Sequence, residues 1–432
     1  MSSMFFLSII VISIVSVLIS VYIHRPDFPE LEIELDDYWK LSDPVKDDDT
    51  IYSYTIDIEN KIIDDFKKRL KSEKVIGKSQ FFKNLTEVML KFDWKQHQNF
   101  LNTFKQYKTE IEGLNIHFLR ISTPLDGKKR VLVPLLMLHG FPGSFWDFFK
   151  VIPILTNPSR YGFDFGVKES IQFEVIIPSL PGFLFSEKPE KPGFDMIASA
   201  RILGKLMRRL DIPKYFVHGG EGIGSDLATL ISSLYPTRVQ GLHLSNPFVR
   251  PTFSTFTLLK YAYNTFQKQE DGNYTDVIEY FASDKYVWPT NPESISTSLV
   301  NSAAGTVKYL ENFWSQYSIA NINDTLNLHF TLDEISTVIY LYWITETIPT
   351  ALQIHANSFG FESKWQTAQV RIPTAIVYTA NTPWRCETEI LSDKYLNVTR
   401  VNELPKGGLF HYLQDPNKIA EDIFSFVELQ LL

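Results

Sequence analysis

A single carboxylate stands in a glycine-rich turn, where residues 217–230 read VHGGEGIGSDLATL. A strand-like apolar run ends at Val217, glycines surround Glu221, and a helical pattern follows. A sharp strand-to-helix turn is a way to expose a nucleophile, so Glu221 is the first candidate. A second frame, GSDLAT at residues 224–229, makes Asp226 the alternative. Asp226 falls where the positive end of a helix dipole favours carboxylates, so the sequence favours Glu221 as the nucleophile.

A second cluster that could do chemistry precedes this turn. The run LMLHGFPGSFWDFFKVIP starts at Leu136, and its tetrad consists of His139, Gly140, Phe141 and Pro142. In a parallel sheet, loops at the carboxyl ends of the strands face the ligand. Backbone N–H groups in such a loop can stabilise a developing oxyanion. The N–H groups of Phe141 and Gly222 are the predicted donors.

Short apolar runs surround these two turns and predict the sheet that positions them. The runs PLLMLHGF, FEVIIPSLPGF, YFVHGG and GLHLSNPFV are separated by helical patterns, and TAIVYTA and YLNVTRVNELP follow much later. Buried runs that alternate with helices predict a parallel sheet with helices on both faces. The fold class is therefore α/β, interrupted by a helical insertion and closed by a helix at residues 417–432.

Two regions outside the sheet are predicted to be helical. Before the sheet, residues 59–73 and 94–113 carry apolar side chains at helical spacing and predict a helical packing module. Between the two groups of strands, residues 250–367 are helical in pattern and rich in aromatic side chains. We expect this insertion to cover the carboxyl ends of the strands.

The N-terminal run MFFLSIIVISIVSVLISVYI, residues 4–23, contains only apolar residues and serines. About 20 apolar residues suffice to cross a bilayer core. No basic residue precedes the run and no cleavage pattern follows it, which favours an uncleaved anchor over a signal peptide. Arg25 then favours a cytosolic position for the rest of the chain by the positive-inside rule.

Composition excludes several other classes. A formal net charge of -8 and the absence of a basic stripe argue against nucleic acid as a partner. The single cysteine, Cys386, excludes an intramolecular disulfide framework. The sequence contains no metal-ligand spacing, phosphate loop or dinucleotide fingerprint, so neither a metal nor a cofactor is expected. The oligomeric state is not predicted.

The chain resembles the microsomal-type epoxide hydrolases, a group of the α/β-hydrolase superfamily that includes insect juvenile-hormone epoxide hydrolases. The resemblance rests on FDWKQHQNFLNTFKQYKTEIEGLNIHF, HGFPGSFWDFFKVIP, PSLPGFLFSEKPEKPGF, SARILGKLM, GLHLSNP, TNPESISTSLVNSAAG, YWITETI and KGGLFHYLQDPNKIAEDI, which span nearly the whole chain. It implies an α/β-hydrolase fold with a helical cap, and a single-pass protein of the endoplasmic reticulum membrane.

The expected regions follow from this resemblance. A membrane anchor at residues 1–24 precedes an N-terminal region at 25–125. The α/β-hydrolase core is expected in two segments, 126–249 and 368–432, with the helical cap at 250–367 inserted between them.

The family reaction that the resemblance implies has two steps. An aspartate attacks an epoxide carbon and forms an alkyl-enzyme ester, and a histidine oriented by an acid activates the water that cleaves it. Here GGEGIGS replaces the family pattern Gly-Gly-Asp-x-Gly-Ser, so Glu221 stands for the aspartate and one residue is inserted. The family histidine position is Leu409, with His411 two residues later.

The remaining family positions also differ. The acid position falls on Arg385, with Glu387 and Glu389 close enough to substitute. One of the cap tyrosines that hydrogen-bond the epoxide oxygen falls on His355. The other falls on Asp284 or, with a small shift, on Tyr286.

These departures at separate places predict an epoxide-hydrolase-like protein that is weak or inactive. Two alternatives stay open. One is an active epoxide hydrolase with Glu221 as nucleophile, His411 as base and Glu387 as orienting acid. The other is a binding protein for apolar, epoxide-like ligands. A serine hydrolase using Ser225 lacks a suitable nucleophile frame. The aromatic-rich cap and the anchor favour an apolar small-molecule substrate or ligand.

Overall fold

The carboxyl ends of six parallel strands form the edge of the sheet at which the candidate residues meet. The computed structural model describes Ser16 and residues 37–74, 79–124, 130–163, 170–249, 292–318, 330–358, 364–382, 385–386 and 388–431. Within these residues the sheet has nine strands in the order β1-β2-β3-β5-β4-β6-β7-β8-β9. Its strands are β1 (Tyr52–Tyr54), β2 (Gln106–Ile111), β3 (Leu114–Ile121), β4 (Arg130–Leu138), β5 (Ser170–Pro178), β6 (Tyr215–Gly219), β7 (Val239–Ser245), β8 (Thr374–Thr379) and β9 (Val398–Leu404).

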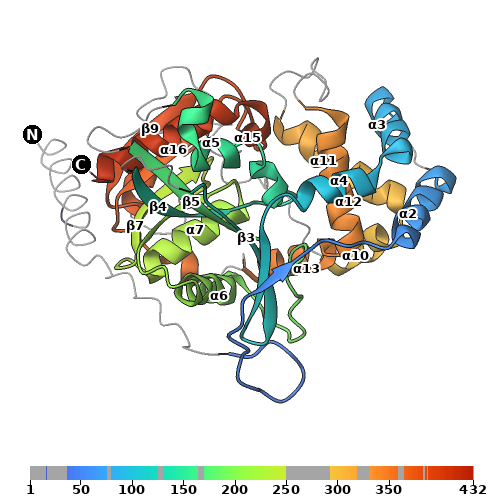
Figure 1. Cartoon of the computed structure of the whole chain (residues 1–432), viewed down its shortest axis with the longest axis horizontal. Helices are drawn as coiled ribbons and strands as arrows, with labels where there is room; N and C mark the ends of the chain where they lie inside the picture. The colour runs from blue at the N-terminus through green and yellow to red at the C-terminus, as the bar shows by residue number, and fades with distance from the viewer. Residues whose placement is uncertain are drawn as a thin grey trace, which may run out of the picture.

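Strands β4 to β9 pair in parallel, which confirms the predicted parallel sheet. The central strands are apolar runs because helices cover both of their faces. The helices of this core are α5 (Ile152–Thr156), α6 (Met196–Arg209), α7 (Ile223–Leu234), α14 (Thr388–Lys394), α15 (His411–Gln414) and α16 (Pro416–Leu431), with short 3-10 turns at Phe145–Phe148, Pro158–Tyr161 and Lys364–Thr367. Helix α16 is the predicted closing helix, and it lies with β9 at the red end of the chain (Figure 1).

The N-terminal region contains strands as well as helices. Its helices are α2 (Asn60–Ser72), α3 (Gln80–Lys91) and α4 (Trp94–Leu101). The predicted helix over residues 94–113 was wrong in its second half, because α4 ends at Leu101 and β2 follows. Strand β2 pairs with β3, which pairs with β5 of the main sheet, so hydrogen bonds to a distant part of the chain decide the conformation.

A buried ion cluster attaches the β2–β3 turn to the core. Glu112 is 2% exposed and forms this turn together with Gly113; both have positive φ, 54° and 80°. Its Oε1 accepts from Arg201 Nε at 2.6 Å and lies 2.9 Å from Lys205 Nζ, both on α6. Two cations on one buried carboxylate hold the N-terminal strands firmly against this helix.

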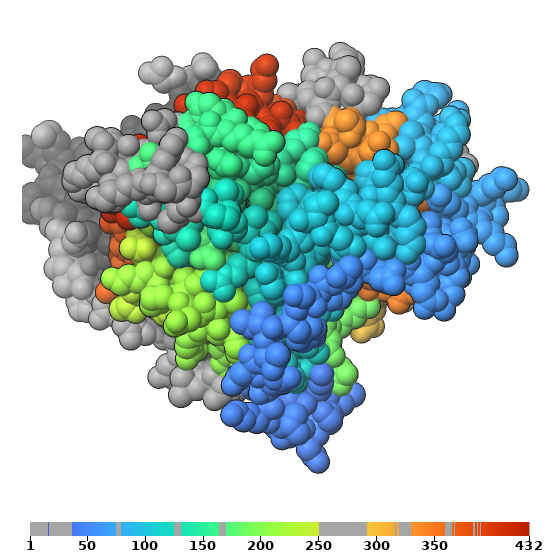
Figure 2. Space-filling view, in the orientation of Figure 1, coloured from blue at the N-terminus to red at the C-terminus, as the bar shows by residue number. Residues whose placement is uncertain are grey.

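Four described helices lie between β7 and β8 in the chain, in the region that we call the cap. Its described helices are α10 (Pro292–Val300), α11 (Ala303–Ser318), α12 (Leu332–Thr345) and α13 (Ile348–Ser358). Tyr340 of α12 stacks on Phe92 at 5.0 Å and donates its hydroxyl hydrogen to Met89 O at 2.8 Å. The N-terminal helices α2 and α3 therefore lie beside α11 and α12 (Figure 1), and N-terminal residues cover much of this face (Figure 2).

Of the predicted anchor at residues 4–23, only Ser16 belongs to the described residues. Among the residues that are described, no helix combines the length and the apolar character needed to cross a membrane.

Candidate active site

The turn after β6 has its corner at Gly222. Strand β6 ends at Gly219, and α7 begins at Ile223 with Gly222 as its N-terminal cap at φ 61° and ψ -125°. The residue at the corner, where φ is positive, is therefore a glycine, and Glu221 stands one residue before it. Gly224 permits close packing here, because a Cβ atom would lie 2.6 Å from His139 O.

The structure brings Glu221 and His411 together. His411 is the first residue of α15, directly after the loop that follows β9, and its Nδ1 lies 3.4 Å from Glu221 Oε1. The two residues are 1% and 7% exposed, His411 being the more buried. Burial raises the pKa of Glu221, and the neighbouring His411 acts in the opposite direction. A buried carboxylate beside an imidazole in a loop cluster is an arrangement typical of catalytic sites.

Each ring nitrogen of His411 also lies near a hydrogen-bonding group other than Glu221. Nδ1 lies 3.1 Å from Gly408 O, and Nε2 lies 3.2 Å from Ser245 Oγ at the end of β7. A carbonyl only accepts hydrogen bonds, whereas a hydroxyl can donate or accept. The imidazolium form can therefore donate from both nitrogens. The neutral tautomer with its hydrogen on Nε2 leaves Nδ1, which lies 3.4 Å from Glu221 Oε1, without a hydrogen.

The predicted tetrad lies against Glu221. A Cβ atom on Gly140 would stand 2.2 Å from Glu221 O, so only glycine fits at this position. His139 Nδ1 donates to Gly140 O at 2.8 Å, and Leu180 N–H donates to His139 Nε2 at 3.2 Å. Burial lowers the pKa of His139 to about 4. His139 is thus a neutral imidazole that joins two loops and fixes the backbone on the oxyanion side.

Aromatic side chains of the cap close over the tetrad and the His411 loop. Trp314 of α11 stacks on Phe410 with ring centroids 3.9 Å apart. Tyr342 of α12 donates to Gly143 O at 2.6 Å and packs edge-on against Phe141. The cap therefore reaches both loops that carry the candidate residues.

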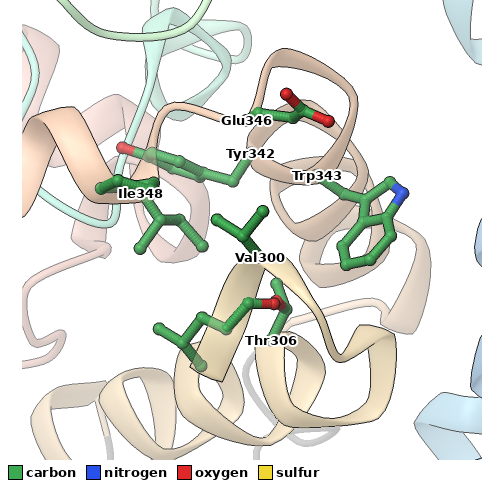
Figure 3. Close-up of a pocket in the computed structure, with 8 residues that line it drawn as sticks. Val300, Thr306, Tyr342, Trp343, Glu346 and Ile348 are labelled. Carbon is green, nitrogen blue, oxygen red and sulfur yellow. The ribbon is translucent and has the colours of Figure 1, made fainter. Parts of the chain in front are cut away.

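A small pocket lies within the cap beside Tyr342 (Figure 3). It is lined by Leu299, Val300, Thr306, Tyr342, Trp343, Glu346, Ile348 and Pro349. Most of these side chains are apolar, so the space suits an apolar ligand.

The family positions for base and acid do not join the pair. Leu409 is buried next to the loop glycines. Arg385 forms an exposed ion pair with Glu403, Nη1 to Oε1 at 2.7 Å. The side chain at the family acid position therefore lies at the surface, and it carries the wrong charge to orient an imidazolium.

Other predicted residues lie elsewhere in the fold or outside the described residues. Asp226 is on α7, where its charge acts on Lys394 of α14, a buried lysine whose pKa burial lowers to about 7. His355 is buried on α13. Glu387, Asp284 and Tyr286 fall outside the described residues, and Glu389 lies in α14.

Two buried groups near the pair were missed from the sequence. Asp147 accepts from Ser144 N–H at 3.0 Å in a capping box, and burial followed by the charge of Glu221 raises its pKa well above the usual value. The S-x-x-D spacing at residues 144–147 is the sequence signal for that box. Ser245 was missed because a serine that ends a buried strand carries no motif.

Both the N-terminal region and the core of the chain are similar in sequence to known proteins. Residues 51–148 match the family Epoxide hydrolase N terminus, and residues 133–383 match the alpha/beta hydrolase fold family. Epoxide hydrolase 1 of Sus scrofa is 30% identical over 412 residues, covering 89% of this chain and 90% of that protein. The chain belongs to the microsomal-type epoxide hydrolase family.

Other members of the family agree in sequence and in structure. Juvenile hormone epoxide hydrolase of Manduca sexta is 31% identical and covers 93% of this chain and 90% of its own length. The crystal structure of juvenile hormone epoxide hydrolase from Bombyx mori superposes with a TM-score of 0.81 at 26% identity, covering 92% of this chain and 99% of that one. The expected α/β-hydrolase fold with a helical N-terminal module is confirmed.

The buried, neutral His139 predicts a pH dependence of stability. Between its unfolded pKa of 6.5 and the folded value of about 4, the unfolded chain binds a proton that the folded chain does not. Stability is therefore lost as the pH falls through this window, by about 1.4 kcal/mol per pH unit for this one group. We expect His139→Gln to remove this contribution to the slope, measured by urea unfolding at pH 7, 6 and 5.

Other buried histidines keep their own contributions, because burial also lowers the pKa of His117 and of His218. The comparison is therefore the difference in slope between variant and wild type. Parallel slopes would contradict the assignment of a neutral, buried His139.

Proposed function

We propose that this protein is an epoxide hydrolase that acts on apolar epoxides with Glu221 as nucleophile and His411 as base. The observation that carries the proposal is the 3.4 Å approach of His411 Nδ1 to Glu221 Oε1 in a buried site. A base within reach of the carboxylate is what a two-step hydrolysis requires. Membership of the epoxide hydrolase family supports the reaction class.

In the first step an oxygen of Glu221 attacks an epoxide carbon. A carbon–oxygen ester bond forms while the ring carbon–oxygen bond breaks, and the ring oxygen takes a proton from a donor in the cap. His355 and Tyr286 remain the predicted donors. Opening a strained ring needs no separate leaving group, which is why a carboxylate suffices as nucleophile.

In the second step a water oxygen adds to Cδ of the Glu221 ester while His411 takes its proton. The bond between Cδ and the alkyl oxygen then breaks. The alkyl oxygen takes the proton from His411 to complete the diol, and the proton lost by the restored carboxyl group returns to the cap donor. N–H groups near the tetrad can stabilise the oxyanion that forms in between.

The two departures at the nucleophile offset each other in this proposal. The inserted residue moves the carboxylate back from the corner at Gly222, and glutamate is one methylene longer than aspartate. The longer side chain thereby restores contact with a histidine that has itself moved from position 409 to 411.

The second candidate is a family member with impaired chemistry that binds apolar ligands. The exposed ion pair of Arg385 favours it, because an orienting acid is missing from the family position. The pocket beside Tyr342 serves either candidate, since its apolar lining suits an epoxide as substrate or as ligand.

The first test uses an apolar aromatic epoxide such as stilbene oxide. We expect diol formation by the wild type and background rates for Glu221→Gln, because an amide is a poor nucleophile. In His411→Gln the ester should form but hydrolyse about 10²–10⁴-fold more slowly. Intact-protein mass spectrometry should then show one covalently added epoxide.

Arg385→Gln is the matched control, and its rate should equal that of the wild type. Full activity of Glu221→Gln would overturn the assignment of the nucleophile. No diol from the wild type, together with thermal stabilisation by the epoxide, would favour the binding protein.

The offset between insertion and side-chain length is tested by Glu221→Asp. Shortening the side chain by one bond, about 1.5 Å, should slow alkylation by on the order of a hundredfold, although aspartate is the family residue. Deleting Gly222 in the same variant should recover much of that loss. A single Glu221→Asp variant as fast as the wild type would contradict the offset.

We also propose that residues 4–23 anchor the protein in the endoplasmic reticulum membrane with the hydrolase domain in the cytosol. Their apolar run and the basic Arg25 that follows support this. The full chain should stay with the membrane fraction after carbonate extraction, whereas residues 25–432 should be released. Release of the full chain by carbonate would refute the anchor.

A further inference from the structure

Behind His411, on the side away from Glu221, lies a line of buried polar side chains. His411 Nε2 is 3.2 Å from Ser245 Oγ. Next to this serine is Tyr412, whose ring lies 4.0 Å from the His411 ring and whose hydroxyl is 2.9 Å from His218 Nε2. Burial raises the pKa of the Tyr412 phenol well above its usual value, and a hydrogen bond with the side chain of Ser245 acts in the opposite direction.

The line continues through the sheet to an acid. His218 on β6 and His243 on β7 are register partners, with their Nδ1 atoms 2.9 Å apart. His243 Nε2 lies 2.8 Å from Asp422 Oδ2 on α16. The other oxygen of Asp422 accepts from Arg400 Nη2 at 2.8 Å and from Asn402 Nδ2 at 2.7 Å, both on β9.

We call Ser245, Tyr412, His218, His243 and Asp422 the Asp422 relay. Each of its members is at most 4% exposed. Buried polar groups of this kind are costly unless every member is satisfied, and a fully satisfied network has a defined direction.

The ionisation state of Asp422 sets the direction of the hydrogen bonds in the relay. Burial disfavours the charged form of Asp422, but the hydrogen bond and the charge of His243, the hydrogen bond from Asn402 and the charge of Arg400 outweigh it, so its pKa lies below the usual value. An ionised carboxylate only accepts. His243 Nε2 therefore donates to Asp422, and in neutral His243 the Nδ1 atom accepts from His218 Nδ1. His218 Nε2 then accepts from the hydroxyl of Tyr412.

If every hydrogen bond of the relay is donated toward Asp422, Ser245 at the opposite end can accept a hydrogen bond from His411. With the Tyr412 hydrogen committed to His218, the phenolic oxygen can accept from Ser245, and Ser245 can accept from His411 Nε2. The carbonyl of Gly408 competes by accepting from Nδ1 at 3.1 Å. A chain that ends in an ionised carboxylate favours the hydrogen on Nε2, because each hydrogen bond of such a network polarises the next one.

We propose that the Asp422 relay takes the place of the orienting acid that the family position 385 lacks, by holding the hydrogen of His411 on Nε2 and stabilising its imidazolium. Nδ1 then carries no hydrogen and lies 3.4 Å from Glu221 Oε1, where a base is needed for the second step. The residues of the Asp422 relay are positioning residues, because they act on the substrate only through His411. The proposal rests on the proposed function for the reaction it serves.

Other ionisable groups also act near the pair. Glu221 faces Nδ1 from the turn after β6, while Tyr412 and His218 belong to the relay itself. Asp147 lies close enough to Glu221 for the charge of that carboxylate to raise its pKa. Substitutions at Asp422 leave all four of these groups in place.

The test compares the full-length wild type with Asp422→Asn, which is nearly isosteric and removes the charge at the end of the relay. We expect alkylation by stilbene oxide to change less than twofold and hydrolysis of the ester to slow at least about tenfold, so that the covalent adduct accumulates. The acid limb of the hydrolysis rate should move to lower pH, because the imidazolium of His411 is less stabilised.

Glu421→Gln is the matched control. It removes a carboxylate from the preceding residue of α16, where Glu421 forms an exposed ion pair with Lys418 at 2.9 Å. Both rates and the pH midpoint should stay at wild-type values. Tyr412→Phe, which removes one hydroxyl from the middle of the relay, should reproduce the effects of Asp422→Asn and serves if that variant does not fold.

A readout that needs no turnover separates this proposal from the proposed function. The ¹⁵N chemical shifts of labelled histidine should show the hydrogen of His411 on Nε2 in the wild type and a loss of this preference in Asp422→Asn. If the wild type forms no adduct but the tautomer shifts, the proposed function fails and the relay stands. If the adduct forms while tautomer, hydrolysis rate and pH midpoint are unchanged in Asp422→Asn, the relay is refuted and the function stands.

Discussion

The contact on which the candidate site depends is the approach of a carboxylate to an imidazole inside the protein. Glu221 and His411 are both almost fully buried, with Oε1 and Nδ1 3.4 Å apart. Burying an isolated charge is expensive, and a nearby group of opposite charge offsets some of that expense. Burial raises the pKa of Glu221 for this reason, with His411 opposing the shift. The partial opposition of the two charges therefore makes their joint burial less costly than the burial of Glu221 alone.

Those loops are held by two layers. Below, the parallel sheet ends β4, β6, β7 and β9 at one edge, so the His139 tetrad, Glu221, Ser245 and the loop before His411 converge there. Above, Trp314 and Tyr342 of the cap contact Phe410 and the tetrad loop. The cap is in turn fixed by the N-terminal helices through Tyr340. A displacement anywhere in this stack changes the geometry of the pair.

The departures from the family pattern are connected in the folded protein. An insertion moves the corner of the turn to Gly222, a longer acid takes the nucleophile position, and the histidine moves to the first residue of α15. Arg385 lies at the surface, while a line of buried groups from Ser245 to Asp422 stands behind the imidazole. Considered separately, each change suggests a lost function. Considered together in space, they form an altered arrangement in which a carboxylate and an imidazole are again in contact.

Local pattern was enough for much of the fold. Apolar runs predicted the parallel strands, helical spacing predicted α2, α6, α7 and the cap helices, and the motifs singled out Glu221 and His411 by residue type. These features are encoded within about ten to twenty neighbouring residues, as periodic burial requires. The prediction was wrong at β2. Residues 106–111 continue the amphipathic spacing of the preceding helix, but they form a strand by pairing with β3.

Local sequence patterns could not predict the distances between side chains inside the site. Whether His411 meets Glu221 depends on the packing of β6 against the loop after β9, and the sequence places these elements far apart. The same holds for His218, His243 and Asp422, which look like unrelated polar residues until register and helix packing align them. The sequence by itself determined the fold, the family and the candidate residue types. Only the tertiary structure decided which of them meet, because hydrogen bonds and ion pairs depend on positions to within about an ångström.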